Sequence, residues 1–223
     1  MEKRKVTIHR NAIEKFLMFL KDFVKHHRKP VIISSVGILL AVIVFVGGAV
    51  FYDFSTKKEL RAYEELMSAY ETGTKDDASF NKTVAGLVKI TDASYFGYVH
   101  QNGYYVAAGL YFEHKMFADA KKYYLLFADT SSSSSFAPLA LFQAGVCAEN
   151  FEKYDEALDL YKRIEKNYKD SAFNDRLFYD LGRMQSKKGD KAAAKESFKK
   201  VMTQYPNSTY AVQSKIRLFL LGL

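Results

Sequence analysis

The chain has 223 residues, a formal net charge of +8, three prolines and a single cysteine. One cysteine excludes a disulfide within the chain, and it suits an oxidising compartment because no wrong pairing can form within the chain. The scarcity of proline, together with abundant Lys, Glu, Ala and Leu, predicts an all-α protein.

Residues 1–29 form a basic leader with nine Lys or Arg and three acidic residues, a formal +6 of the chain's +8. The remainder carries only +2, which argues against a nucleic-acid partner. Spacings of three and four predict an amphipathic helix with an apolar face of Ile13, Phe16, Leu17, Leu20, Phe23 and Val24. Two roles stay open. In the first, the helix lies on anionic lipid or on a membrane partner. In the second, it only secures membrane insertion and extends its cations to the lipid headgroups.

Between Lys29 and Asp53 lie 23 residues without a charge. As a helix this run would reach about 33 Å, enough to cross a hydrocarbon core of about 30 Å. The run lacks the polar stripe of a buried core helix, and it is longer than the apolar region of a cleaved signal peptide. The sequence therefore predicts one transmembrane helix over residues 30–52.

The charges that flank this run predict its orientation. Since positive residues stay on the cytoplasmic side, we expect a cytoplasmic N-terminus and a C-terminal domain across the membrane. In a bacterium this describes a single-pass inner-membrane protein with a periplasmic domain. A eukaryotic protein of the same orientation stays open.

Three segments of the C-terminal part repeat with a period of 37 residues. One set of small residues in register is Ala120, Ala157 and Ala194, and a second is Ala108, Gly145 and Gly182. Large apolar residues recur between the two sets. Because antiparallel helices approach closely only where side chains are small, this pattern predicts a solenoid of helix hairpins.

The repeats resemble the tetratricopeptide repeat family. The third unit fits best, with Phe178, Leu181, Gly182, Ala194, Phe198, Val201 and Pro206 at the family's large, Leu, Gly, Ala, Phe, small and Pro positions. The period of 37 residues departs from the family's usual length of about 34. The resemblance implies three repeats over residues 100–209.

Further segments flank the three repeats. Phe80, Leu87 and Ile90 keep the same register upstream, which predicts a degenerate first hairpin within residues 53–99. A capping helix is expected within residues 210–223.

Catalytic and metal-binding patterns are absent from the sequence. Past the uncharged run the only histidines are His100 and His114, which are too far apart for a metal pair on one helical turn. There is no Gly-rich phosphate loop and no Cys/His cluster, so we expect no enzyme activity, no cofactor and no metal. Cys147 lies in an apolar stretch and is expected to be buried rather than reactive.

By the resemblance, proteins or peptides are expected in a groove lined by the first helix of each repeat. The family's groove positions fall on Asn102, Tyr105, Gly109, Phe112, Leu139, Phe142, Val146, Asn150, Arg176, Tyr179 and Arg183. The stripe begins aromatic and ends basic. We expect apolar side chains of a partner at its start and a carboxylate at Arg176 and Arg183. Alternatively, Tyr105, Phe112 and Phe142 belong partly to the core.

The order of leader, span and repeats is similar to the ancillary subunit family of the bacterial SecYEG translocon. Those proteins sit in the inner membrane beside the secretion channel and pass substrates to periplasmic chaperones. The resemblance implies a chaperone-like factor for exported proteins. A scaffold for envelope assembly or cell division is the alternative, and an enzyme is the third hypothesis.

Overall fold

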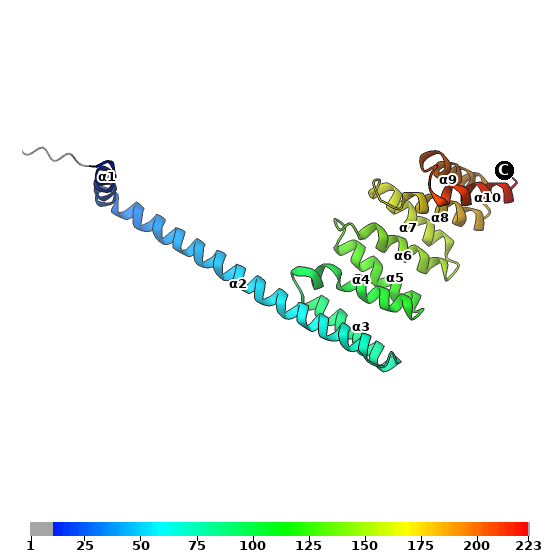
Figure 1. The fold of residues 1–223 in the computed structure, drawn as a ribbon, viewed down its shortest axis with the longest axis horizontal. Helices are drawn as coiled ribbons and strands as arrows, with labels where there is room; N and C mark the ends of the chain where they lie inside the picture. The colour runs from blue at the N-terminus through cyan, green and yellow to red at the C-terminus, as the bar shows by residue number, and fades with distance from the viewer. Residues whose placement is uncertain (1–10, 223) are drawn as a thin grey trace, which may run out of the picture. The chain divides into compact units, whose positions relative to one another are not determined.

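The computed structural model describes residues 11–222, and every regular element in this part of the chain is helical, which confirms the all-α prediction. The helices (Figure 1) are α1 Ala12–His26, α2 Arg28–Thr72, α3 Asp77–Ala93, α4 Gly97–Glu113, α5 Phe117–Thr130, α6 Ala137–Glu149, α7 Tyr154–Asn167, α8 Asn174–Lys187, α9 Lys191–Gln204 and α10 Thr209–Leu220. The leader's basic residues Lys3, Arg4, Lys5 and Arg10 lie outside the described residues.

The chain divides into two units, Met1–Phe54 and Ser55–Leu223. The first unit contains α1, which buries none of its side chains. Its exposed apolar residues include Ile13, Phe16, Leu17, Leu20, Phe23 and Val24. By length and composition, α2 is the one helix among residues 11–222 that could cross a membrane.

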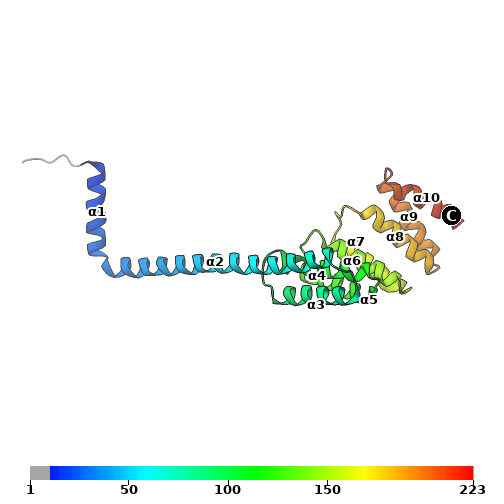
Figure 2. The ribbon, with the colours of Figure 1, turned by 60° about the horizontal axis from the view of Figure 1, so that its bottom comes forward.

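The second unit is a stack of helix hairpins. Figures 1 and 2 both show the pairs α4–α5, α6–α7 and α8–α9 following one another, each beside the pair before it. The helices pack chiefly against their neighbours in the chain, and α10 packs on α9 and α8. Upstream, the side chain of Leu66 on α2 lies against Gly86 on α3, which joins these two helices.

The turns inside the three hairpins share one backbone motif. Lys115, Glu152 and Gly189 lie 37 residues apart, and each has a positive φ, of 59°, 56° and 82°. The next amide donates a hydrogen bond to a carbonyl five residues earlier, from Met116 to Tyr111 and at the equivalent places in the other two hairpins. This is the Schellman arrangement, which satisfies carbonyls left free at a helix end. The motif stops each first helix and reverses the chain.

The core of the hairpins is built on the small residues of the repeat. Ala120, Ala157 and Ala194, one in each second helix, are fully buried. On the first helices, Gly145 lies against the ring of Tyr161 and Gly182 against the ring of Phe198. The missing side chains let a second-helix aromatic ring rest on the backbone of the first helix, which is how the repeat brings its two helices together.

Candidate protein-binding surface

The predicted groove residues lie on the first helix of each hairpin, α4, α6 and α8. Most of them keep some exposure to solvent. Asn102, Tyr105, Gly109, Phe112, Leu139, Val146 and Arg183 are partly exposed, and Asn150 and Arg176 are exposed. The two asparagine amides donate hydrogen bonds to carbonyls of their own helices, Tyr98 and Val146.

The aromatic end of the candidate surface consists of Tyr105 and Phe112, which are partly buried and partly exposed. The ring of Tyr105 lies 5.2 Å from that of Phe127 and 5.8 Å from that of Phe136. The ring of Phe112 lies 5.4 Å from that of Phe117 in an edge-on contact. Part of each ring is therefore buried in the core and part is exposed, as the alternative interpretation expected.

Phe142 departs from the expected position. Only 1% of it is exposed, so its ring offers no surface to a partner. The ring packs against Tyr161 at 5.2 Å and Phe173 at 5.5 Å, and the guanidinium of Arg176 covers it at 4.6 Å. The connector and first turn of the following hairpin therefore bury this residue.

Tyr179 is buried for a similar reason, with 8% of it exposed. The ring of Tyr210, at the start of α10, lies 5.3 Å away, and Arg217 on the same helix donates a hydrogen bond of 3.3 Å to the Tyr179 hydroxyl. The capping helix thus covers the end of α8, and it places Arg217 beside the predicted surface.

Arg183 is occupied by carboxylates of its own chain. Its Nε lies 2.6 Å from Asp180 Oδ1, and its Nη2 lies 2.9 Å from Glu149 Oε2 on α6. Glu149 also accepts a hydrogen bond of 2.6 Å from the Tyr161 hydroxyl. This buried cluster links three helices, α6, α7 and α8, and it leaves Arg183 without the capacity expected of a free carboxylate receptor.

The electrostatics of the cluster agree with its geometry. Burial disfavours the charge on Arg183, but Asp180 and Glu149 outweigh this effect and raise the pKa of the guanidinium. Burial also raises the pKa of the Asp180 carboxyl, and Arg183 partly offsets this. The pKa of Tyr161 is raised by burial and by the adjacent Glu149. These groups stabilise the fold as a connected network rather than presenting charge to solvent.

Further basic residues lie beside Arg183, one turn along α8 and on the facing α10. A hollow of about 190 Å³ is lined by Arg183, Ser186 and Lys187 from α8 and by Arg217 from α10. Arg176, Lys187 and Arg217 are exposed. Sequence reasoning missed Lys187 and Arg217, since one follows the family's groove positions and the other belongs to the cap.

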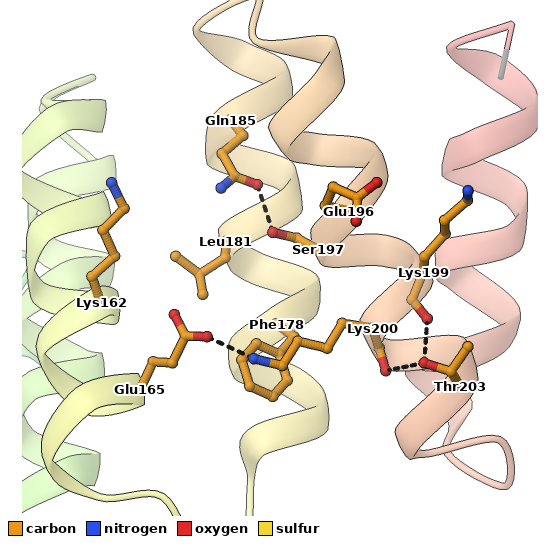
Figure 3. A pocket seen from close by; sticks show the side chains of 10 residues that line it. All are labelled: Lys162, Glu165, Phe178, Leu181, Gln185, Glu196, Ser197, Lys199, Lys200 and Thr203. Carbon is orange, nitrogen blue, oxygen red and sulfur yellow. Dashed lines mark hydrogen bonds and ion pairs between the residues drawn. The ribbon is translucent and has the colours of Figure 1, made fainter.

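A larger cavity, of about 410 Å³, lies among α7, α8 and α9 (Figure 3). In it, Lys200 Nζ lies 2.6 Å from Glu165 Oε1 and 3.8 Å from the centroid of the Phe178 ring. The Gln185 amide and the Ser197 hydroxyl are hydrogen-bonded at 2.7 Å. These four polar or charged groups thus bond to one another across the cavity, which Lys162, Glu196 and Lys199 also line.

Ion pairs also join neighbouring second helices. Lys121 on α5 pairs with Glu156 on α7 at 2.6 Å, and Arg163 on α7 pairs with Asp129 on α5 at 2.5 Å. With the Lys200–Glu165 pair, these contacts use charges of the second helices to hold hairpins together. Lys187 and Arg217 contact tyrosine hydroxyls instead, those of Tyr154 at 3.5 Å and Tyr179 at 3.3 Å.

Comparison with known proteins agrees with this architecture. The family described as "Tetratricopeptide repeat-like domain" matches residues 21–217. The chain therefore belongs to this family. Its fold is that of a scaffold that binds proteins or peptides, and such repeats typically catalyse no reaction. Among residues 11–222, no group of three or more His, Cys, Asp or Glu side chains is placed to hold a metal.

A curated relative is a "TPR repeat-containing protein" from Treponema pallidum (strain Nichols), 24% identical over 127 residues. The match covers 57% of this chain and 53% of the relative, so the chain spans about half of the relative's length. A crystal structure of MamA protein has a TM-score of 0.51 at 16% identity, over 72% of this chain and 78% of that one. MamA from Desulfovibrio magneticus RS-1 has a TM-score of 0.49 at 14% identity, over 68% and 77%. The first of these structures shows a shared fold and nothing more.

Proposed function

We propose that this protein is a membrane-anchored scaffold that binds segments of other polypeptides on the first-helix side of its solenoid. The uncharged part of α2 would span the membrane, with the basic leader in the cytoplasm and the solenoid on the opposite side. In a bacterium the solenoid would lie in the periplasm. The observation that carries the proposal is α2 itself, one helix from Arg28 to Thr72 that contains both the uncharged run and a helix of the first hairpin.

The exposed side chains define what the surface would bind. Tyr105, Phe112, Leu139 and Val146 offer apolar edges, and Asn102 and Asn150 offer amide oxygens. Farther along, Lys187 and Arg217 offer cations, and so does the exposed part of Arg176, which also pairs with Asp180 at 3.6 Å. A partner segment with apolar residues followed by acidic residues would match this order.

The place in the cell suggests a role. A peptide-binding solenoid whose first helix continues directly from a membrane span is suited to polypeptides that emerge from a secretion channel. Anchoring supplies a high local concentration, so weak and promiscuous binding is sufficient. We therefore infer a chaperone-like factor for exported proteins, associated with the Sec translocon. The exposed apolar face of α1 and its neighbouring cations would rest on anionic lipid or on a channel subunit.

A second function is favoured by α10. Val212, Ile216, Phe219 and Leu220 form an exposed apolar stripe on this helix. Permanent interfaces are more hydrophobic than transient ones, so such a stripe suits one stable partner. A scaffold for envelope assembly or cell division would use such a contact.

Crosslinking in cells tests the two functions. A photoreactive residue at position 105 should capture many exported proteins if the protein is a chaperone-like factor. A single dominant partner would support the assembly scaffold instead. The matched control is the same residue at Lys162, which is exposed on the second helix of a hairpin.

Charge reversal tests the surface. Arg176→Glu combined with Lys187→Glu should weaken capture at position 105, while Lys162→Glu combined with Lys166→Glu on α7 should leave it intact. Equal capture by both double variants would rule out the basic end of the surface. Protease added to spheroplasts should digest the solenoid, and a solenoid protected until lysis would overturn the proposed topology.

A further inference from the structure

The loop between α3 and α4 is fixed at two points. Ser94 is buried, its hydroxyl donates to the Ile90 carbonyl at 2.8 Å, and its own carbonyl accepts a hydrogen bond of 2.8 Å from His100 Nδ1. Gly97 has a φ of +78°, and a Cβ added there would lie 2.8 Å from the Thr56 methyl group on α2. Only glycine combines this backbone conformation with so close a contact.

Aromatic side chains project to solvent from the residues between and beside these fixed points. Tyr95 is 75% exposed, Tyr98 is 50% exposed and Phe96 is 46% exposed. Tyr98 contacts Tyr63 on α2, with ring centroids 5.5 Å apart. Burial, together with a hydrogen bond to Tyr98, raises the pKa of Tyr63 to about 12. The backbone therefore holds three rings at one edge of the second unit, beside α2.

The contact between Gly97 and Thr56 limits the distance between this loop and the end of the uncharged run. Thr56 is three residues beyond Asp53, the first charge after the uncharged run. Three residues of chain reach at most about 10 Å, whatever their conformation. The headgroup region extends roughly 5–7 Å beyond the hydrocarbon core on each side. With residues 30–52 in the membrane, Thr56 and the adjoining Gly97 lie in the headgroup region or a few ångströms beyond it.

The chemistry of the exposed residues fits that environment. Tyrosine rings favour the membrane interface because the ring is apolar and the hydroxyl can stay among headgroups. Lys57 and Lys58 follow Thr56 directly, and cations at this level can approach lipid phosphates. In water, by contrast, the exposed parts of these three aromatic side chains gain no hydrophobic stabilisation, because they remain in contact with solvent.

We propose that Tyr95, Phe96 and Tyr98 form an aromatic anchor that inserts into the lipid headgroup region on the solenoid's side of the membrane. This rests on the membrane span of the proposed function. The anchor would give the first hairpin a contact with the bilayer that is separate from α2. The first hairpin would then stay at a constant distance from the bilayer, close to where a polypeptide emerges.

The chain contains no tryptophan, so single substitutions create unique fluorescent reporters. Tyr95→Trp reports on the loop. Phe45→Trp, at a 77% exposed position in the uncharged run, reports on the span, and Phe219→Trp, at an 82% exposed position on α10, is the matched solvent control. Each full-length variant is reconstituted in vesicles of phosphatidylethanolamine and phosphatidylglycerol, with or without lipids brominated near the headgroup end of their acyl chains.

We expect the emission of Tyr95→Trp to shift to the blue and to lose most of its intensity in brominated vesicles, while Phe219→Trp is unchanged. If Phe45→Trp is quenched and Tyr95→Trp behaves like Phe219→Trp, the aromatic anchor is wrong and the span stands. If Phe45→Trp is not quenched, the span itself fails. Insertion predicts that Tyr95→Trp with Phe96→Ser is quenched less than Tyr95→Trp alone. Unchanged quenching would contradict a role for Phe96.

Discussion

Gly182 on α8 lies directly against the ring of Phe198 on α9, so that an added Cβ would stand 2.6 Å from Phe198 Cε1. One repeat earlier, a Cβ at Gly145 would stand 2.4 Å from Tyr161 Cε1. In both hairpins a ring fills the space that the absent side chain leaves. The contact holds the two helices of a repeat at their close separation.

Gly182→Ala should therefore destabilise the solenoid by about 1–3 kcal/mol, because the added methyl group forces the Phe198 ring or the helices apart. Gly109→Ala is the matched control, since a Cβ at Gly109 meets no atom within 4 Å. That substitution should stabilise α4 by about 0.5–1 kcal/mol through its helix propensity. Thermal unfolding of the detergent-solubilised chain, followed by circular dichroism, measures both. Equal midpoints for the two variants would contradict this account.

At the turns inside the hairpins, substitution to glycine should stabilise the protein. Lys115 and Glu152 adopt the left-handed conformation that costs a non-glycine residue about 1–2 kcal/mol. Lys115→Gly and Glu152→Gly should therefore raise the unfolding temperature. Gly189→Ala should lower it, because the third turn already has the residue that the conformation favours. A stable Gly189→Ala variant would show that this turn tolerates a side chain.

Removal of Arg183 should cost much more than removal of a surface arginine. Arg183→Met removes the nearest cation from Glu149 and Asp180, whose side chains are only 13% and 7% exposed, and leaves Asp180 with Arg176 at 3.6 Å. Loss of one partner from such a buried network costs about 3–5 kcal/mol. The control is Arg163→Met, whose partner Asp129 is 57% exposed, with an expected cost below about 1 kcal/mol. Equal destabilisation of the two variants would contradict a structural role for the cluster.

The same variant should respond to pH. Burial already raises the pKa of Asp180, and Arg183 is the main group that lowers it. Without Arg183, the folded chain holds a proton on this carboxyl more tightly than the unfolded chain does. The penalty of Arg183→Met should therefore shrink as pH falls from neutrality and grow as pH rises. Unfolding measured across this range in the variant and the parent protein tests the sign.

Cys147 should be unreactive in the folded protein. It is fully buried, and burial raises the pKa of its thiol to about 12, so little thiolate forms at ordinary pH. Ellman's reagent should label it only after denaturation. Ser133→Cys in a Cys147→Ala background places a thiol at an exposed position and should react at once. Rapid labelling of native Cys147 would show that α6 opens.

The fold could be read from the sequence because the period of 37 residues places small and large residues at equivalent points of each hairpin. The exposure of the candidate surface residues was harder to predict. Phe142 and Tyr179 occupy groove positions in the repeat alignment, but aromatic residues of the following unit, Phe173 and Tyr210, lie over them. The spacing of residues within one repeat does not indicate which side chains the next repeat will bury.

The expectation that Arg183 would be free to bind a carboxylate of a partner failed for a related reason. One of its partners, Glu149, lies 34 residues earlier on α6, and nothing local in the sequence joins the two. Asp180 lies only three residues away, but an acidic neighbour on a helix is usually solvated, so its burial could not be read from spacing. Arg217 was overlooked because the cap was expected to seal the stack, whereas it also adds a cation to the surface.

The hairpins of the second unit contact chiefly the helices before and after them in the chain. Stiffness in such a stack is local, and small rotations at successive interfaces add together. The curvature of the solenoid can therefore change while each hairpin stays folded. A pull applied at α10 would separate the last hairpins first, and the α4–α5 pair would unfold after them.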